Sequence, residues 1–377
     1  MIETPGFFWS LVFFFVAIGP LIFIHEMGHY LVGRWCGVKA DVFSIGFGRE
    51  IVGWNDSRGT RWKLSLLPLG GYVKFAGDMS AASEPSEEWK SLPEADRAVT
   101  FQAQPLWQRA AIVAAGPITN LLLAVVIFMA LIGYYGQART PSVISAVAPG
   151  SAAAAAGFVA GDRVTAIGDT KVSQFDQISD VVALRPGVAM SFTVDRGGVE
   201  RTIIAAPAEK VVTDRFGNVS RLGQLGISSG PVISVKVPPL ELPVVAVMQT
   251  WRVLKSMVDG LGQIIWGRVS VKELGGPLKI AKYSGQMATL GFAAFLSFVA
   301  LISINLGFIN LLPIPMLDGG HLTFYTIEAI LRRPVSAQVQ EWAFRAGFAI
   351  LIGFMVLVNF NDLESFGVFE GLSRLIG

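Results

Sequence analysis

Four long apolar segments divide the sequence into spans and loops. They lie at about 7–32, 106–135, 290–312 and 342–360. An α-helix needs about 20 residues to cross the ~30 Å hydrocarbon core of a bilayer, and each segment meets or approaches that length. The pattern therefore predicts a polytopic α-helical membrane protein with four transmembrane helices.

The polar stretches between the spans have patterns of their own. Residues 35–105 alternate apolar and polar positions between Gly-rich turns, which is typical of short β-hairpins; within them, 79–98 is charged and predicted to be a mobile surface segment. Residues 139–230 contain several strand-like runs and one helix-like run, enough for a small domain with its own core. Residues 231–289 are amphipathic and expected to lie at the membrane surface.

These patterns predict eight consecutive parts along the chain. They are 1–34 (first span), 35–105 (β-hairpin loop region), 106–136 (second span), 139–230 (inserted domain), 231–289 (amphipathic, interfacial region), 290–320 (third span), 342–360 (fourth span) and 361–377 (C-terminal tail).

Composition and charge agree with a membrane protein. Charged residues make up 15% of the 377 positions and hydrophobic residues 52%, whereas a soluble domain carries about 25% charge. The net charge of +2, without a basic stripe, gives no sign of nucleic-acid binding. The only cysteine, Cys36, excludes an intramolecular disulfide and is interpreted as a packing residue. The first apolar segment lacks a charged leader and a cleavage site, so we expect it to be retained.

Lys and Arg residues predict the orientation of the spans. They are abundant in the first loop, and Arg332 and Arg333 lie in the third, whereas the N-terminal tail has none. Because cytoplasmic loops are enriched in these residues, the first and third loops are expected in the cytoplasm. Both termini and the inserted domain are then extracytoplasmic.

Two histidines and a glutamate lie inside the first apolar segment. His25, Glu26 and His29 form the pattern H-E-x-x-H, in which residues four apart share one helix face. Both imidazoles can then reach one Zn²⁺, and Glu26 can take a proton from the attacking water as general base. The pattern can arise by chance, but ionisable groups inside a span are costly and usually functional.

A catalytic zinc needs a third protein ligand, and the end of the third span offers one. In "NLLPIPMLDGGH", the prolines break the helix and Gly319 and Gly320 allow a tight turn. Asp318 is the expected oxygen ligand, and His321 is either a competing ligand or a partner that orients the ligands. The alternative interpretation of this stretch is an ordinary loop leaving a span.

These motifs together resemble the site-2 protease family (M50) of intramembrane zinc metalloproteases, in particular its bacterial RseP-type branch, which performs regulated intramembrane proteolysis. The resemblance covers nearly the whole chain. It implies that one Zn²⁺ is bound by His25, His29 and Asp318, with Glu26 as catalytic base. The family's cleft-lining and G-P-x-x-N residues correspond here to Asn310, Pro313 and Pro315, and to Gly116, Pro117 and Asn120. For Asn120, a role in orienting the ligands and plain helix packing both remain open.

The resemblance also assigns roles to the loops. The stretch "LSLLPLGGYVKFAGD", with Gly70 and Gly71, matches a membrane-reentrant β-hairpin that pairs with substrate as a strand. The run "APGSAAAAAGFVAGDRVTAIGD" resembles a circularly permuted PDZ domain, which binds extended peptides or C-terminal segments. Many RseP-type proteins carry two PDZ domains, and this chain has room for one.

The implied function is hydrolysis of single-span membrane proteins, such as an already trimmed anti-sigma factor or a signal-peptide remnant, in the bacterial inner membrane. Two other classes stay open. A metal or ion transporter could use the same polar residues, but the sequence has no internal repeat. A membrane-anchored PDZ scaffold would explain 139–230 and leave H-E-x-x-H without a role.

Overall fold

The computed structural model describes residues 6–77, 89, 91–183, 185–213, 219–265 and 275–365. The chain divides into two compact units. The first comprises residues 1–130, 243–262 and 269–377, and the second comprises 131–242 and 263–268. Each unit is described by itself.

Four helices are long and apolar enough to cross a membrane, as the sequence predicts. They are α1 (Phe7–Trp35), α4 (Leu106–Tyr135), α9 (Phe292–Leu311) and α11 (Ala337–Ser365). Large apolar side chains such as Phe8, Val16 and Leu31 stay exposed along α1, as expected of a surface in contact with lipid. The predicted tail at 361–377 is helical as far as Ser365, and its remainder lies outside the described residues.

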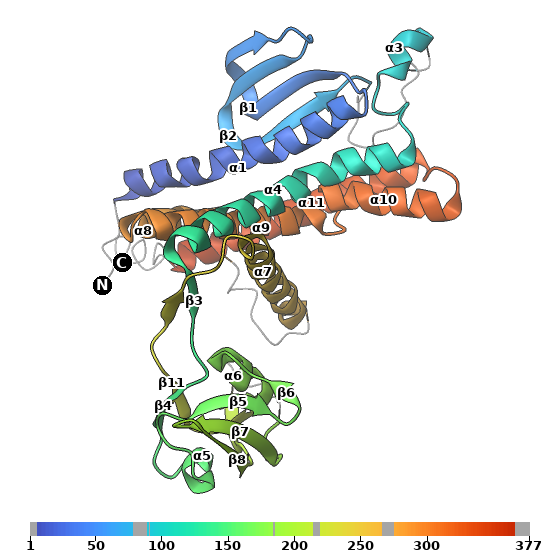
Figure 1. Cartoon of the computed structure of the whole chain (residues 1–377). Helices are drawn as coiled ribbons and strands as arrows, with labels where there is room; N and C mark the ends of the chain where they lie inside the picture. The colour runs from blue at the N-terminus through green and yellow to red at the C-terminus, as the bar shows by residue number, and fades with distance from the viewer. Residues whose placement is uncertain are drawn as a thin grey trace, which may run out of the picture. The chain divides into compact units, whose positions relative to one another are not determined.

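α1 and α4 run antiparallel (Figure 1), and small residues let them approach each other closely around Gly28. A methyl group on Gly28 would lie 2.6 Å from the carbonyl oxygen of Ala115, so only glycine fits there. Four residues earlier in α1, the carbonyl of Ile24 accepts a hydrogen bond of 3.1 Å from the hydroxyl of Thr119. Small residues that allow close backbone approach are typical of helix pairs in membranes.

A β-hairpin lies against α1 in the same unit (Figure 1). Strands β1 (Ala40–Asn55) and β2 (Arg61–Phe75) are bent by bulges, so that residues 42–45 of β1 pair with both 61–64 and 71–74 of β2. Residues 71–75 therefore form an edge, with no strand on their other side among the described residues. Phe43 and Phe75 anchor the sheet in a buried aromatic cluster with Tyr30 of α1.

The third loop contains a helix that the sequence analysis did not predict. After α9, residues 312–317 form a short connection and α10 (Asp318–Leu331) begins at Asp318 itself. The remaining helices of this unit are α3 (Glu94–Ala98), α7 (Leu242–Ile265, its two ends assigned to the second unit) and α8 (Pro277–Thr289). Most of the predicted mobile segment 79–98 lies outside the described residues, and its end forms α3.

The second unit is a small β-rich body with its own core. A four-stranded antiparallel sheet has the order β6 (Thr170–Lys171), β5 (Arg163–Ile167), β7 (Met190–Arg196) and β8 (Val199–Ala205). Phe192 and Val194 of β7 are fully buried against Ile178 of α6 (Phe175–Ala183). The strand-like runs and the helix-like run seen in the sequence are confirmed at these positions.

Shorter elements complete this unit. They are α5 (Ala152–Ala156), the pair β3 (Gln137–Arg139) with β12 (Ile233–Val235), the pair β4 (Ile144–Val147) with β11 (Ile227–Ser229), and the pair β9 (Ala208–Thr213) with β10 (Val219–Gln224). Gly157 ends α5 in the left-handed conformation, as a C-terminal glycine commonly does.

Candidate active site

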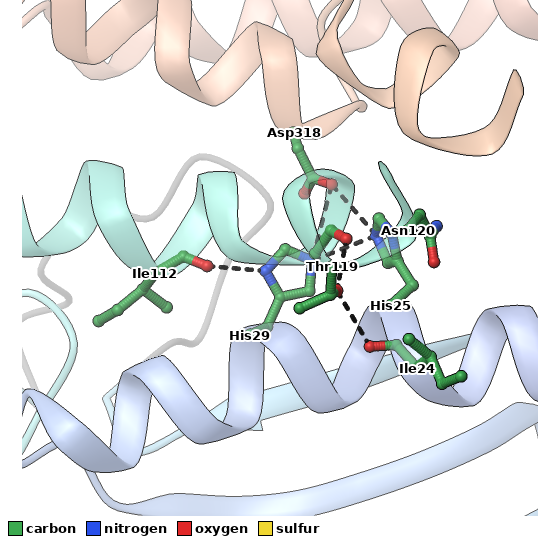
Figure 2. A network of polar contacts seen from close by, with 8 residues as sticks. Ile24, His25, His29, Ile112, Thr119, Asn120 and Asp318 are labelled. Atoms are coloured by element: carbon green, nitrogen blue, oxygen red, sulfur yellow. Dashed lines mark hydrogen bonds and ion pairs between the residues drawn. The ribbon is translucent and has the colours of Figure 1, made fainter. Parts of the chain in front are cut away.

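The two histidines of α1 project from one helix face toward α4 (Figure 2). Their Nε2 atoms are 3.2 Å apart, and their rings meet edge to face. The side chain of His29 bonds through Nδ1 to the carbonyl oxygen of Ile112 at 2.8 Å. Because a carbonyl only accepts, Nδ1 of His29 is the donor, and in the neutral ring the lone pair is then on Nε2.

Asp318 completes a cluster with these rings. Its Oδ2 atom lies 3.2 Å from His25 Nε2 and 3.6 Å from His29 Nε2. The carboxylate reaches this position because α10 begins immediately after the connection from α9. Added methyl groups on Gly319 and Gly320 would collide with backbone carbonyls of residues 311, 312 and 314. The two glycines thus let α10 start close against the end of α9, which aims Asp318 at the histidines.

The donor set and its spacing fit a zinc ion. Three ligand atoms from His25, His29 and Asp318 lie within 4.8 Å of one another. Ligands about 2.0–2.1 Å from a tetrahedral zinc are about 3.4 Å apart, which is close to the three separations above. Two imidazoles and one carboxylate are a common catalytic donor set and leave the fourth position open. The cluster is therefore suited to a catalytic zinc.

Glu26 lies next to the cluster and faces the hairpin edge. It is 8% exposed, and its carboxylate accepts a hydrogen bond from the backbone N–H of Val73. A methyl group on Gly71 would lie 2.9 Å from Cγ of Glu26 and 2.8 Å from the carbonyl oxygen of Ser44. The glycine lets the β2 edge approach the glutamate, so any chain lying along this edge passes beside Glu26.

A cavity of about 560 Å³ contains the cluster and Glu26. Its walls come from α1, the hairpin edge, α4, α9, the start of α10, and α11. Residues lining it include Ile22, Phe47, Val113, Leu306, Leu317 and Leu351. A mostly apolar wall around a few convergent polar groups is typical of a ligand site.

Some of the other predicted site residues line the cavity and others do not. Asn310, Gly70 and Gly71 line the cavity. Pro313 and Pro315 are not among its lining residues; instead, a methyl group on Gly347 of α11 would lie 2.8 Å from Cβ of Pro315.

His321 also lines the cavity, with its ring 5.0 Å from that of Phe344. It is not part of the three-residue cluster found among the described residues. The structure thus places it as a neighbour of the cluster, beside Asp318.

Sequence reasoning missed three contributors to the site. It did not single out the carbonyl of Ile112, which only the structure places at His29. It gave Gly116 no specific contact, whereas a methyl group there would lie 2.9 Å from Cε1 of His25. It also missed Met316, a lining residue with a positive φ of 83°. The spacing of Ile112, Gly116 and Asn120 by four residues is the signal that could have identified one helix face.

Comparison with known proteins identifies the family. Residues 13–354 match Peptidase family M50. The chain belongs to this family, that of the site-2 proteases. It is 45% identical to a predicted zinc metalloprotease of Agrobacterium fabrum, over 97% of this chain and 96% of the relative. It is 42% identical to one of Rhizobium meliloti, over 94% and 96%, and 34% identical to metalloprotease MmpA of Caulobacter vibrioides, over 98% and 99%.

Membership of the family establishes the general activity of the chain. The chain is a metalloendopeptidase of the zinc-dependent site-2 type, and its four apolar helices agree with a membrane protein. A PDZ domain of an SdrC-like protein from Listeria monocytogenes was also found among solved structures. It is 17% identical, with a TM-score of 0.18, over 25% of this chain and 88% of that chain.

Proposed function

We propose that this M50 peptidase cleaves membrane proteins within or near their transmembrane segments, using one zinc ion per chain. The observation that carries the proposal is the position of His25, His29 and Asp318 on helices that are themselves candidate spans or begin where a span ends. The site is thus built from the apolar part of the chain, where a membrane segment would be the accessible substrate.

The roles of the residues follow from their placement. His25, His29 and Asp318 would hold the zinc, which supplies a Lewis acid for the scissile carbonyl when bound. Glu26, beside the cluster, takes a proton from the attacking water and returns it to the leaving nitrogen. Its side chain lines the same cavity as the three ligands.

The hairpin edge supplies a way to hold the substrate. A transmembrane helix hides its backbone amides, so cleavage requires a locally extended segment. The 71–75 edge lies at the cavity wall and has no strand on its outer side among the described residues. An extended segment added there would present its backbone to Glu26, and Asn310 on the facing wall can bond it.

The second unit is the proposed single PDZ domain, which would bind a peptide or a C-terminal segment. A cavity of about 260 Å³ lies between α6 and residues 223–227, where β11 begins. Phe175, Ile178 and Val182 give it an apolar wall, as suits the side chains of an extended peptide. Such a domain fits regulated intramembrane proteolysis of a pre-trimmed protein, for example an anti-sigma factor or a signal-peptide remnant.

The proposed cellular location rests on the Lys and Arg residues of the loops and on the bacterial origin of the relatives. The Lys- and Arg-rich first and third loops favour the cytoplasm, so we expect both termini and the second unit on the other side of the membrane. The relatives named above come from bacteria. The bacterial inner membrane is therefore the expected location.

The proposal is tested with purified full-length protein in detergent micelles. Glu26→Gln should retain zinc and lose cleavage of a single-span model substrate, because the ligands remain while the base is removed. Asp318→Asn and His25→Ala should lose both zinc and cleavage. Glu341→Gln is the matched control, since Glu341 is exposed on α11 and bonded only to Arg345 among the described contacts. Full cleavage by Glu26→Gln would overturn the mechanism.

A further inference from the structure

Asn120 is a fully buried amide beside the cluster of His25, His29 and Asp318, on the α4 face that meets α1 (Figure 2). Its Nδ2 lies 3.1 Å from Nδ1 of His25. Its Oδ1 is buried without a hydrogen-bond partner among the described residues. Its backbone carbonyl accepts a 2.7 Å hydrogen bond from the hydroxyl of Ser303 in α9. An unpaired buried oxygen costs about 1–3 kcal/mol, so its presence calls for a function.

The ligand role of His25 fixes what its other ring nitrogen needs. Nε2 of His25 faces Nε2 of His29 and Oδ2 of Asp318, each at 3.2 Å. To act as a ligand there, His25 presents a lone pair at Nε2 and carries its proton on Nδ1. The Nδ1–H group then needs an acceptor, and the amide of Asn120 is the group that faces it, at 3.1 Å.

The amide of Asn120 can supply that acceptor. The oxygen and nitrogen of an amide occupy nearly the same space, so a half-turn of the amide brings Oδ1 to Nδ1 of His25. The resulting hydrogen bond gives this buried oxygen the partner that it lacks among the described residues.

We propose that Asn120 is a positioning residue whose amide oxygen accepts a hydrogen bond from Nδ1 of His25 when His25 acts as a zinc ligand. The inference rests on the proposed function, since it takes His25 as a ligand. It assigns Asn120 a task distinct from helix packing. The amide holds the ring of His25 in one orientation and stabilises the proton at Nδ1 that the metal-binding form requires.

Two substitutions at Asn120 separate this role from packing. Asn120→Asp keeps the shape and can accept from Nδ1–H, as the zinc-binding form requires. Asn120→Leu has a similar volume and can neither donate nor accept. Ser303→Ala is the matched control, because it removes a contact to the backbone of Asn120 and leaves the amide in place.

The measurement is zinc affinity of the full-length protein in micelles, by competition with a chelator, with Co²⁺ absorption as a second report on ligand geometry. Asn120→Leu should bind zinc about 10–100-fold more weakly, the usual effect of losing a partner of a ligating histidine. Asn120→Asp should bind within about threefold of wild type or more tightly, and its Co²⁺ spectrum should match wild type. Ser303→Ala should stay within about threefold.

Two results would overturn the inference. One is Asn120→Leu protein that binds zinc as tightly as wild type. The other is Asn120→Asp protein that binds more weakly than Asn120→Leu, which would mean that His25 needs a donor there. Either result leaves the proposed function intact if the wild-type protein holds zinc and Glu26→Gln abolishes cleavage. Circular dichroism of each variant confirms that loss of zinc does not reflect loss of the helices.

Discussion

The substitution Gly116→Ala should destroy the metal site with a single methyl group. Gly116 lies in α4 directly across from the two histidines of α1. A Cβ at this position would lie 2.6 Å from Cε1 of His29 and 2.9 Å from Cε1 of His25, and closer still to Nε2 of His29. Both imidazoles would have to move, or the two helices would have to separate.

The size of the effect follows from these distances. Carbon atoms in contact are normally about 3.5–4.0 Å apart, so the methyl group overlaps His29 by about 1 Å. Ligand distances in a zinc site hold to about ±0.2 Å. A displacement of that size removes His29 from the coordination geometry. We expect zinc affinity to fall by at least the 10–100-fold seen when an orienting partner is lost, and cleavage to fall with it.

The assay is chelator competition for zinc on full-length protein, followed by cleavage of a single-span substrate. Gly19→Ala in α1 is the matched control, since a methyl group there meets nothing within 4 Å. It should leave zinc affinity unchanged and stabilise the helix by up to ~1 kcal/mol. Wild-type zinc affinity in Gly116→Ala protein would refute the close approach of α4 to the histidines.

Two further predictions concern ion pairs. Arg109 of α4 bonds Glu328 of α10 at 3.0 Å, and both side chains are mostly buried; Glu328→Gln should lower the free energy of unfolding by about 3 kcal/mol. The double variant with Arg109→Met should lose less, and an additive loss in denaturant titrations would contradict this. In the second unit, burial alone would raise the pKa of Asp162, but hydrogen bonds and charge from Arg196 hold it below its ordinary value. The pair therefore stabilises the unit above about pH 3.9, and the stabilisation is lost as pH falls through the lowered pKa. Arg196→Met should reduce amide protection of β5 and β7 about tenfold at pH 7, and the difference from wild type should shrink below pH 3.9; a constant difference would contradict the assignment.

The spans and the core of the site could be predicted because they depend on short-range patterns. Apolar runs give four helices of spanning length, and four-residue spacing puts His25 and His29 on one face. The Asp318 motif follows a break in an apolar run, where a charged side chain costs less free energy than inside an uninterrupted membrane span. The structure brings these three residues together, while their role as zinc ligands stays a prediction.

The features that were missed depend on tertiary contacts. The sequence "DGGHLTFYTIEAIL" has two glycines directly after its first residue, which indicate a turn, yet it forms α10. Each glycine in a helix costs about 1 kcal/mol relative to alanine. Here a larger residue would cost more, because its Cβ would collide with the carbonyls at the end of α9. Likewise, the contact of Gly116 with His25 depends on how α4 is rotated against α1, which no local pattern specifies.

The origin of the ligands from distant parts of the chain has a consequence for biosynthesis. The second histidine and Asp318 are separated by about 290 residues. At about 5–20 residues per second, roughly 15–60 s pass between translation of the two halves of the site. A ribosome-bound chain in which only α1 and α4 have entered the membrane has the two imidazoles and Glu26 but lacks the carboxylate of Asp318. With Asp318 as the proposed third zinc ligand, we expect peptidase activity to begin only after α9 is inserted and α10 has folded, so that the nascent chain and the insertion machinery around it are not exposed to an active protease.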